Sequence, residues 1–317
     1  MERQTFRIIF MGTPDFAVPA LTRLLAGPDR VVAVVTQPDR KKGRGRKLSP
    51  PPIKTMALEH GIPVLQPTKI KTDDFLTMLK SYKADLIVVA AYGRILPPSI
   101  LDLPPLGCIN IHGSLLPRHR GAAPIQWAIL KGDQQAGVTI MRIEEEMDTG
   151  DILLPAAIEI AGDETAGSLF TKLSELGGKT LMEALDLLRQ GKLTPTPQDH
   201  GLATMAPPLK KEDGKIDWTR PAIELHRLIR GLDPWPMASS FLKGKRTRLF
   251  SPEVIYKDTD LAPGTILSGT RQGLLVATGE NCLLIRELQP EGKKRMAAKA
   301  FLCGHPFRPG DAFTREP

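Results

Sequence analysis

Two kinds of apolar pattern alternate along the first 190 residues of the chain. Short apolar runs are separated by longer stretches in which apolar side chains recur every three or four positions. The short runs predict buried strands, and the longer stretches predict amphipathic helices. Strands are therefore expected at residues 6–10, 31–36, 64–65, 85–91, 107–112 and 137–143. Helices are expected at residues 16–25, 53–60, 73–81, 123–131 and 166–189.

This alternation of strands and helices predicts an α/β domain with a doubly wound, mostly parallel sheet. The run at residues 85–91 (Asp-Leu-Ile-Val-Val-Ala-Ala) supports this fold, because a strand covered on both faces is continuously apolar. Residues 37–52 are expected to be irregular, because proline and glycine recur at positions 38, 43, 45 and 50–52. We assign residues 1–189 to this first domain.

The pattern changes after residue 190. Residues 190–208 contain four prolines and are expected to form a linker that runs over the surface. Residues 209–317 contain one expected helix, at 221–231, and short expected strands near residue 250 and at 264–267, 273–277 and 282–288. Short strands with glycine-rich turns predict a small β-barrel. A chain of 317 residues is long enough for two domains, each with its own core.

Positive charge is concentrated in two places. The net charge of the chain is +8, and residues 207–317, with 19 basic and 13 acidic residues, carry +6 of it. Residues 40–47 hold six basic residues, and without them the first 206 residues would have a net charge of −4. This distribution predicts a polyanionic partner.

Several classes of protein are not indicated. No apolar stretch reaches 18 residues, so no membrane span is expected. The first residues lack the apolar region of a signal peptide, so a cytoplasmic location is expected. The three cysteines are far apart, which predicts neither a disulfide framework nor a metal site. The glycines form no dinucleotide-binding or P-loop fingerprint. A monomer is the default expectation.

An asparagine and a histidine share one face of the strand expected at residues 107–112. Neighbouring strand residues point to opposite faces, so Asn110 and His112 project together near the carboxyl end of the strand. Gly113 then allows a sharp turn. Ligands of open α/β sheets bind in the crevice beyond the carboxyl ends of the strands. We therefore expect chemistry at this pair.

These residue types suit the attack of an amine on an activated carbonyl group. The Asn110 amide can donate a hydrogen bond to a carbonyl oxygen as it becomes an oxyanion, and His112 can donate to the same oxygen or move a proton. Asp148, in the sequence Asp-Thr-Gly-Asp, can hold the imidazole in one tautomer or take the proton that an attacking ammonium must lose. The alternative for Asp148 is to shape the turn alone, since aspartate and glycine favour turns.

A covalent mechanism is the other possibility. Ser114 lacks the tight strand-to-helix elbow of a nucleophilic serine. Cys108 lies on the same strand face as Asn110, but a small buried core residue is the better interpretation of this cysteine. Because neither residue is in an activated setting, we expect direct attack by the amine.

The sequence from Asn110 to Gly121 (Asn-Ile-His-Gly-Ser-Leu-Leu-Pro-Arg-His-Arg-Gly), followed by Met-Asp-Thr-Gly-Asp at 147–151, resembles the folate-dependent formyltransferase family. The similarity extends from Arg7 to about Arg308, and the core motif is highly specific. It implies a Rossmann-like catalytic domain, a C-terminal OB-like β-barrel domain that binds tRNA, and 10-formyltetrahydrofolate as cosubstrate. No metal is needed, because hydrogen-bond donors polarise the carbonyl. The catalytic residues that it implies are Asn110, His112 and Asp148, and the folate-binding residues are Ser114, Leu115, Leu116 and Pro117.

Two further segments, at residues 10–19 and 121–126, resemble family members that act on initiator methionyl-tRNA. The implied reaction transfers the formyl group to the α-amine of methionine on this tRNA, for translation initiation. A basic loop is usually just a solvated surface, but the loop at 40–47 follows a strand whose carboxyl end faces the same crevice as His112. Arginine also offers bidentate contacts to phosphate. The residues expected to contact the tRNA are Arg40, Lys41, Lys42, Arg44, Arg46 and Lys47.

Two other functions are compatible with parts of this pattern. A formyltransferase that acts on a small amine, such as a sugar nucleotide or glycinamide ribonucleotide, would have the same three catalytic residues. The basic loop and the basic C-terminal domain favour RNA over such an acceptor. The second alternative is a non-catalytic RNA-binding protein on the same scaffold, and the intact set of three residues argues against it.

Overall fold

The computed structural model describes residues 5–42 and 47–317, without the side chains of residues 41, 42 and 47. The chain divides into two compact units. The first unit comprises Met1–Pro124, Gln135–Ile158 and Phe170–Ala206, and the second comprises Ile125–Gln134, Glu159–Leu169 and Pro207–Pro317. The second unit thus combines the C-terminal third of the chain with two short segments that precede residue 170.

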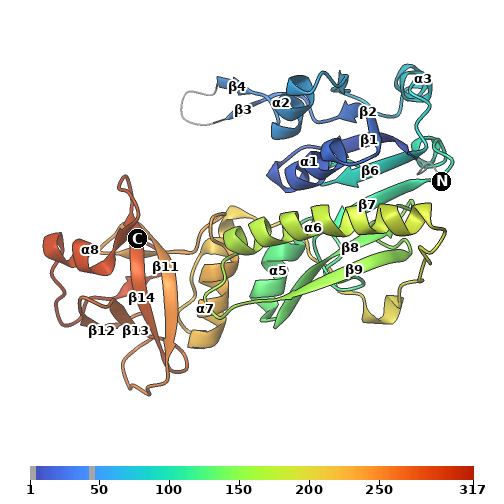
Figure 1. Ribbon diagram of the computed structural model, residues 1–317. Helices are drawn as coiled ribbons and strands as arrows, with labels where there is room; N and C mark the ends of the chain where they lie inside the picture. The colour runs from blue at the N-terminus through green and yellow to red at the C-terminus, as the bar shows by residue number, and fades with distance from the viewer. Residues whose placement is uncertain (1–4, 43–46) are drawn as a thin grey trace. The chain divides into compact units, whose positions relative to one another are not determined.

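A seven-stranded sheet runs through the first unit (Figure 1). The strands from β5 to β7 are parallel to their neighbours, and β8 is antiparallel to β7. This arrangement confirms the predicted α/β fold with a mostly parallel sheet. In spatial order the strands are β5 (Val64–Leu65), β2 (Arg30–Val35), β1 (Arg7–Gly12), β6 (Leu86–Ala90), β7 (Cys108–His112), β8 (Gln135–Arg142) and β9 (Ile152–Glu159).

Apolar continuity explains why β1 and β6 lie inside the sheet. All five residues of β6 and five of the six residues of β1 are buried. The parallel strands around them are connected through α1 (Val18–Ala26), α2 (Pro52–Glu59) and α3 (Asp73–Ser81), as parallel pairing requires. The side chain of Thr72 caps α3 by accepting a hydrogen bond from the backbone N–H of Phe75.

The long helix α6 (Ala166–Arg189) covers the face of β7 that Asn110 and His112 do not use. A Cβ atom added at Gly177 would lie 2.8 Å from Cγ2 of Ile111, so glycine lets the helix backbone approach β7 closely. Ile111 points away from its neighbours Asn110 and His112, because successive strand residues alternate between faces. Neither α6 nor any other described helix is both long enough and apolar enough to cross a membrane.

Residues 37–52 contain regular structure, so the prediction of an irregular segment was wrong. Strands β3 (Arg40–Lys42) and β4 (Lys47–Ser49) form a two-stranded antiparallel hairpin. The glycines fall between the two strands, and the prolines fall before and after them. These residues therefore bound the strands instead of interrupting their hydrogen bonds.

An antiparallel sheet forms the second unit (Figure 1). Its two edges meet where Thr265 pairs with Ala312, and the backbone N–H of Phe313 donates to the carbonyl of Gly264 at 2.8 Å. The sheet therefore curls back on itself, which is the arrangement expected for an OB-like barrel. The strands in order are β12 (Ile266–Gly269), β13 (Leu274–Ala277), β14 (Cys282–Pro290), β11 (Lys245–Ile255), β10 (Ser239–Leu242) and β16 (Phe313–Thr314), with β15 (Met296–Ala297) beside β14.

Helix α7 (Ala222–Gly231) contributes buried side chains to the core of the second unit. It packs on α5 (Pro124–Lys131), since a Cβ atom at Gly231 would lie 2.9 Å from Cγ of Leu130. Elements that the pattern did not predict are short or lie at edges. They include α4 (Pro98–Leu101), α8 (Ala298–Gly304) and β9, whose Pro155 is tolerated at the edge of a sheet.

Burial shifts the titration of His226, on α7. Burial, together with the positive charges of Arg230 and Arg227, lowers the pKa of His226 to about 4. The carboxylate of Glu253 acts in the opposite direction. The Nδ1 atom of His226 is buried and has no hydrogen-bond partner among the described residues. The ring is therefore neutral in the folded protein above about pH 4.

We predict that His226→Leu weakens the dependence of stability on acid pH. Between pH 6.5 and about 4, the unfolded chain binds a proton at His226 that the folded chain does not bind, so the stability of the unsubstituted protein falls as the pH falls. The variant should lose about 2 kcal/mol less free energy of unfolding across this window. Chemical unfolding at both ends of the window measures the difference. Equal losses in the two proteins would contradict a depressed pKa.

Candidate active site

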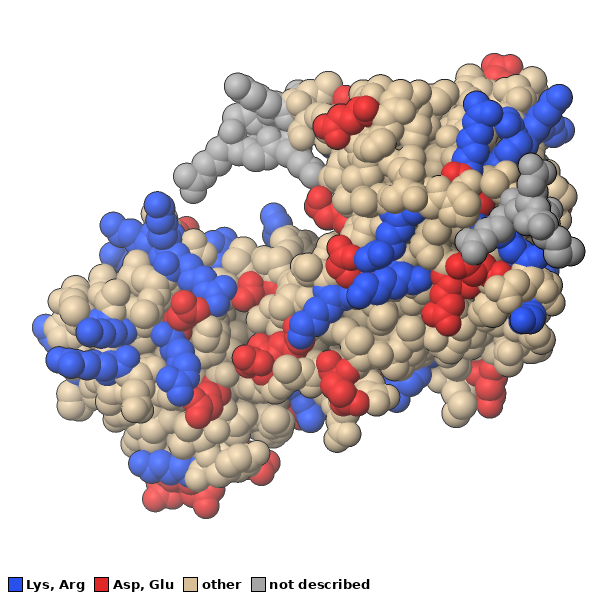
Figure 2. Space-filling model, viewed as in Figure 1, with Lys and Arg blue, Asp and Glu red and all other residues tan. Residues whose placement is uncertain are grey.

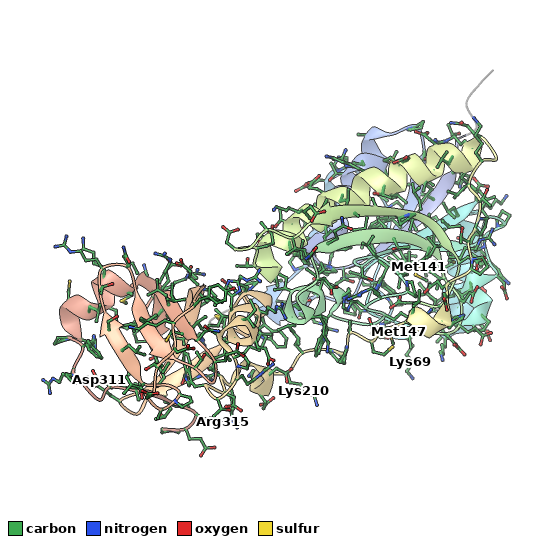
Figure 3. All side chains as sticks on the ribbon, turned by 90° about the horizontal axis from the view of Figure 1, so that it is seen from below. Lys69, Met141, Met147, Lys210, Asp311 and Arg315 are labelled. Atoms are coloured by element: carbon green, nitrogen blue, oxygen red, sulfur yellow. The ribbon has the colours of Figure 1, made fainter. Side chains whose placement is uncertain are left out.

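Strand β7 presents Asn110 and His112 on one face of the first sheet. Every other residue of β7 is buried, His112 included, but Asn110 is partly exposed, which leaves its amide accessible. Across the antiparallel ladder, Asn110 lies opposite Met141, which Figure 3 labels, and His112 lies opposite Thr139. The two polar side chains are thus fixed by strand pairing and not by a loop.

The His112 ring contacts two groups. Its Nε2 atom lies 3.0 Å from the carbonyl oxygen of His119, and because a carbonyl only accepts, Nε2 carries a proton. Its Nδ1 atom lies 3.6 Å from Oδ1 of Asp148. This separation is within ion-pair range but is longer than a hydrogen bond. The structure therefore brings Asp148 to the same ring that β7 positions.

Asp148 reaches His112 from the loop that joins β8 to β9. Because β8 is antiparallel to β7, its last residue, Arg142, lies opposite Ile109 near the start of β7, and the following loop returns toward His112. Asp148 has a left-handed backbone (φ 56°), which aspartate tolerates better than most residues. Its Oδ2 atom accepts a hydrogen bond from the backbone N–H of Gly121 at 2.8 Å. The carboxylate is thus bonded to the Gly121 N–H through Oδ2 and faces the His112 ring with Oδ1.

Two glycines make this arrangement sterically possible. Gly121 has a φ of 120°, and a Cβ atom there would lie 2.8 Å from the carbonyl oxygen of Ala206. A Cβ atom at Gly150 would overlap the carbonyl oxygen of Arg142. A side chain at either position would displace the backbone that carries Asp148 or its Gly121 partner.

Thr139 fixes the turn that follows β7. Its hydroxyl donates to the carbonyl of Ser114 at 2.7 Å and accepts from the N–H of Leu116 at 3.1 Å. The Ser114 hydroxyl is buried and donates to the carbonyl of Arg118 at 2.6 Å. A hydroxyl bonded to a backbone carbonyl has no base beside it, so Ser114 is not an activated nucleophile.

The thiol of Cys108 is also inactive as a nucleophile. Cys108 belongs to the buried core of the first unit. Burial, together with the negative charge of Asp102, raises the pKa of this thiol to about 12. At neutral pH the thiol therefore stays protonated, whereas a nucleophilic cysteine needs its thiolate.

A cavity of 590 Å³ lies beside β7 at the end where the strand begins. Gly107 and Cys108 form part of its wall, and the loop that leads to Asp148 forms another part. This volume suits one small-molecule ligand. None of residues 114–117 lines the cavity. No group of three or more His, Cys, Asp or Glu in the described part of the chain is arranged to hold a metal ion. The ionisable residues named in the lining, apart from Cys108, are Asp102, Arg142, Glu144, Glu145, Glu146 and His200.

Two buried residues that the sequence pattern did not single out support the loop around Asp148. Gln198 is only 6% exposed and bonds to the backbone of this loop, and Arg120 bonds to Gln198. Gln198 lies in the segment that was expected to run over the surface as a linker. Proline-rich composition indicates irregular backbone, but it carries no signal for a side chain that turns inward.

The hairpin of β3 and β4 is anchored at its base by Asp39. The Asp39 carboxylate accepts from Nζ of Lys54 at 2.8 Å and from the Gln66 amide at 2.7 Å, and these bonds lower the pKa of Asp39. Arg40 is exposed. The backbone of the three lysines expected to contact tRNA lies in the two strands. The remaining two candidates, Arg44 and Arg46, lie outside the described residues.

Two family models match the chain. A formyl transferase model matches residues 6–185, and a model of the formyl transferase C-terminal domain matches residues 208–306. Together they account for most of both units, in the order in which the sequence resemblance implies them.

Relatives align along nearly the whole chain. The methionyl-tRNA formyltransferase of Desulfotalea psychrophila is 63% identical over 303 residues, which are 96% of this chain and 94% of that protein. The methionyl-tRNA formyltransferase of Geobacter sulfurreducens is 51% identical over 304 residues, which are 96% of this chain and 95% of that protein.

Solved structures share the fold at lower identity. A sugar 3N-formyl transferase, solved in the presence of dTDP and 5-N-formyl-THF, matches 92% of this chain and 100% of its own with a TM-score of 0.67 at 16% identity. HypX from Aquifex aeolicus matches 98% of this chain and 51% of its own with a TM-score of 0.63 at 20% identity. These likenesses concern the fold alone, whereas the family models and the relatives at high identity establish that this chain belongs to the formyl transferase family.

Proposed function

We propose that this chain transfers the formyl group of 10-formyltetrahydrofolate to the α-amine of methionine on initiator tRNA, for translation initiation. The observation that carries this proposal is the meeting of His112 and Asp148 beside the accessible amide of Asn110. Relatives named for this reaction align with almost the entire chain. The catalytic residues of the proposal are Asn110, His112 and Asp148.

The reaction begins when the neutral amine nitrogen attacks the formyl carbon. As the new C–N bond forms, the carbonyl electrons move to the oxygen, which becomes an oxyanion. Collapse of this intermediate restores the carbonyl and breaks the bond to N10 of the folate. The amine nitrogen loses a proton, and N10 gains one. The protein must therefore stabilise one oxyanion and carry one proton between two nitrogens.

Asn110 and His112 supply the hydrogen bonds to the oxyanion in this mechanism. The Asn110 amide donates from the middle of β7. The Nε2–H of His112 is already bonded to the carbonyl of His119, so Nδ1 of the protonated ring is the donor that turns to substrate. The 3.6 Å gap between Nδ1 and Asp148 supports this assignment, because no short hydrogen bond has to break first.

Asp148 has two tasks in the proposed mechanism. Its negative charge stabilises the protonated form of His112, which faces Oδ1. Because the Gly121 N–H occupies Oδ2, it is Oδ1 that remains for the proton of the attacking amine. A carboxylate whose Oδ2 is already bonded to a backbone N–H loses less conformational freedom when substrate binds.

The cosubstrate is proposed to bind at the turn of residues 114–117, after the end of β7, and to extend to the cavity at the start of the strand, which the loop that leads to Asp148 also lines. Leu115 and Pro117 are the partly exposed residues of this turn, while Ser114 and Leu116 are buried and shape it. The cavity beside Cys108 has carboxylates in its lining, and these accept hydrogen bonds from ring N–H groups such as those of a pterin. The folate-binding residues of the proposal are Ser114, Leu115, Leu116 and Pro117.

RNA binding is assigned to the β3–β4 hairpin and to the second unit. Figure 2 shows lysine and arginine side chains (blue) at several places on the surface of the C-terminal part of the chain, which Figure 1 colours orange and red. The net charge of +6 in residues 207–317 supports contact with a polyanion. We assign residues 1–189 to catalysis, residues 190–208 to the connection and residues 209–317 to tRNA binding. The tRNA substrate and its use in translation imply a cytoplasmic location, and a monomer is the simplest assembly.

We predict formyl transfer to methionylated initiator tRNA when the purified chain is supplied with 10-formyltetrahydrofolate. Unacylated initiator tRNA should not react, because it lacks the α-amine, and methionylated elongator tRNA should react more slowly. Formylmethionyl-tRNA is measured after separation of the products. An amino-sugar nucleotide serves as the competing acceptor. Transfer to that amine without transfer to tRNA would establish the small-amine alternative instead, and no transfer to any amine would favour the non-catalytic one.

We predict that Asn110→Ala and His112→Ala each lower kcat by about 100- to 1000-fold, because each removes one donor to the oxyanion. Single-turnover formylation of methionyl-tRNA measures the effect. Ile111→Val is the matched control, since Ile111 lies between the two residues on the same strand but points to the opposite face. Near-normal turnover in a folded Asn110→Ala or His112→Ala protein would refute the proposed roles.

We predict that neutralising the hairpin weakens tRNA binding in a salt-dependent way. The variant replaces Arg40, Lys41, Lys42 and Lys47 with glutamine. Its dissociation constant for methionyl-tRNA should rise, and the slope of log affinity against log salt should shrink by about one for each phosphate that the variant no longer neutralises. The control removes four exposed lysines elsewhere on the first unit, and its slope should match that of the unsubstituted protein. The control lysines are Lys69, Lys71, Lys80 and Lys83.

A hairpin variant with an unchanged slope would contradict an RNA-binding role for Arg40, Lys41, Lys42 and Lys47. An affinity of the unsubstituted protein that does not fall as salt rises would contradict the electrostatic basis of the proposal as a whole.

A further inference from the structure

The segment after α6 places a buried amide against the loop around Asp148. Its backbone is fixed just before this amide, where Thr196 and Ile152 exchange two hydrogen bonds of 2.8 Å. Two residues further on, Gln198 is 6% exposed. A buried glutamine needs partners for two N–H donors and for its carbonyl oxygen. The contacts of Gln198 supply all of them.

The orientation of the Gln198 amide is set by its partners. Its Oε1 atom accepts from Nε of Arg120 at 3.1 Å and from Nη2 of Arg120 at 2.6 Å. A guanidinium only donates, so Oε1 must face Arg120 and the amide nitrogen must face the other way. There, Nε2 donates to the carbonyl of Asp148 at 2.9 Å and to the carbonyl of Gly150 at 2.7 Å. The reverse orientation would bring two donors together and leave two carbonyls without a donor.

These two hydrogen bonds span the turn in which Asp148 has its left-handed backbone. This conformation is uncommon for a non-glycine residue, even though aspartate tolerates it better than most, and hydrogen bonds to the turn stabilise it. By holding the carbonyls on both sides of Thr149, Gln198 fixes the peptide groups that follow Asp148. The direction of the Asp148 side chain depends on those groups.

Arg120 and Gly121 hold Asp148 by two routes. The N–H of Gly121 bonds directly to Oδ2 of Asp148, and the side chain of Arg120 acts through Gln198. Arg120 is itself buried, and its backbone is paired on both sides with the segment that carries Gln198, through Thr204 and Ala206. The dipeptide thus ties the turn after β7, the Asp148 loop and residues 196–206 together.

We propose that Gln198 is a positioning residue for formyl transfer, and that its two carbonyl contacts keep the Asp148 carboxylate directed at His112. Arg120 fixes the orientation of the Gln198 amide. The inference rests on the proposed role of Asp148 in the reaction. Gln198 touches neither reacting group, so its effect on the rate passes through Asp148.

The test compares Gln198→Met and Gln198→Glu with the unsubstituted protein. Methionine has a similar length but no donors, and glutamate keeps an acceptor for Arg120 while turning an oxygen toward the two carbonyls. Both variants should lower kcat for methionyl-tRNA by about 10- to 100-fold, the range expected when two buried carbonyls lose their donors. The KM for methionyl-tRNA should stay within about twofold, since RNA contacts are assigned to other residues.

A double-mutant cycle separates positioning from a general loss of structure. Asp148→Asn keeps the backbone carbonyl that Gln198 holds but removes the carboxylate. In this background, Gln198→Met should lower kcat by less than about threefold, because nothing remains for Gln198 to direct. If the loss of kcat in the double variant equals the product of the losses in the two single variants, the proposal is overturned. It is also overturned if the Gln198 variants keep kcat within about threefold of the unsubstituted value.

Arg7→Met is the matched control. The Arg7 guanidinium donates to the carbonyl of Lys83 at 3.0 Å and to the carbonyl of Tyr82 at 2.7 Å, and Lys83 has a left-handed backbone (φ 47°), so the variant removes the same kind of bridge from a part of the first unit that has no proposed role in catalysis or RNA binding. Its kcat should be unchanged. Thermal unfolding tests whether each variant is folded at the assay temperature. If a Gln198 variant is unfolded, Arg120→Lys replaces it, and this variant should also lower kcat.

The cycle also separates failure of this inference from failure of the proposed mechanism. Loss of activity in Asp148→Asn with normal activity in both Gln198 variants overturns only the role of Gln198. Full activity in Asp148→Asn removes the proposed role of Asp148, and the role of Gln198 falls with it.

Discussion

The site depends on the contacts of the Asp148 carboxylate, which lies between the His112 ring and the N–H of Gly121. These groups come from a strand, from the turn after that strand and from a loop between two other strands. The contact therefore depends on the relative positions of all three segments. The left-handed backbone of Asp148 and the crowding at Gly121 show how little freedom the arrangement leaves.

The sheet provides the fixed reference for this contact. β7 is paired on both sides, by β6 and β8, and α6 covers its other face. Thr139 of β8 lies opposite His112 and also bonds to both ends of the short turn from Ser114 to Leu116. One threonine therefore sets the histidine and the proposed folate-binding turn in a common register. The loop that runs from the end of β8 to Asp148 is not fixed by strand pairing. Residues 196–206 hold this loop in place.

Much of the fold and of the site could be predicted from local sequence, because the alternation of side chains between the two faces of a strand is a local property. It placed Asn110 and His112 on one face, and the apolar run that became β6 indicated a parallel sheet. The hairpin at residues 40–49 was missed because a few charged residues between prolines and glycines have no apolar period, although their backbones can still pair. Gln198 was missed for a different reason. Its importance lies in hydrogen bonds to residues about 50 positions away in sequence, and no periodicity encodes such contacts.

Chemistry and acceptor recognition obey different physical constraints in this chain. The reacting atoms of a formyl transfer are the same whatever molecule carries the amine, so the three proposed catalytic residues contain no information about the acceptor. They require short-range geometry, which paired strands, buried hydrogen bonds and crowded glycines supply. Recognition of a polyanion requires summed charge that acts over several ångströms and is screened by salt. An exposed hairpin around Arg40 and a second unit with excess positive charge meet that requirement without a fixed register. In the proposed function, the three catalytic residues and the charged surfaces that select the acceptor are therefore separate, although the hairpin belongs to the same unit as the catalytic residues.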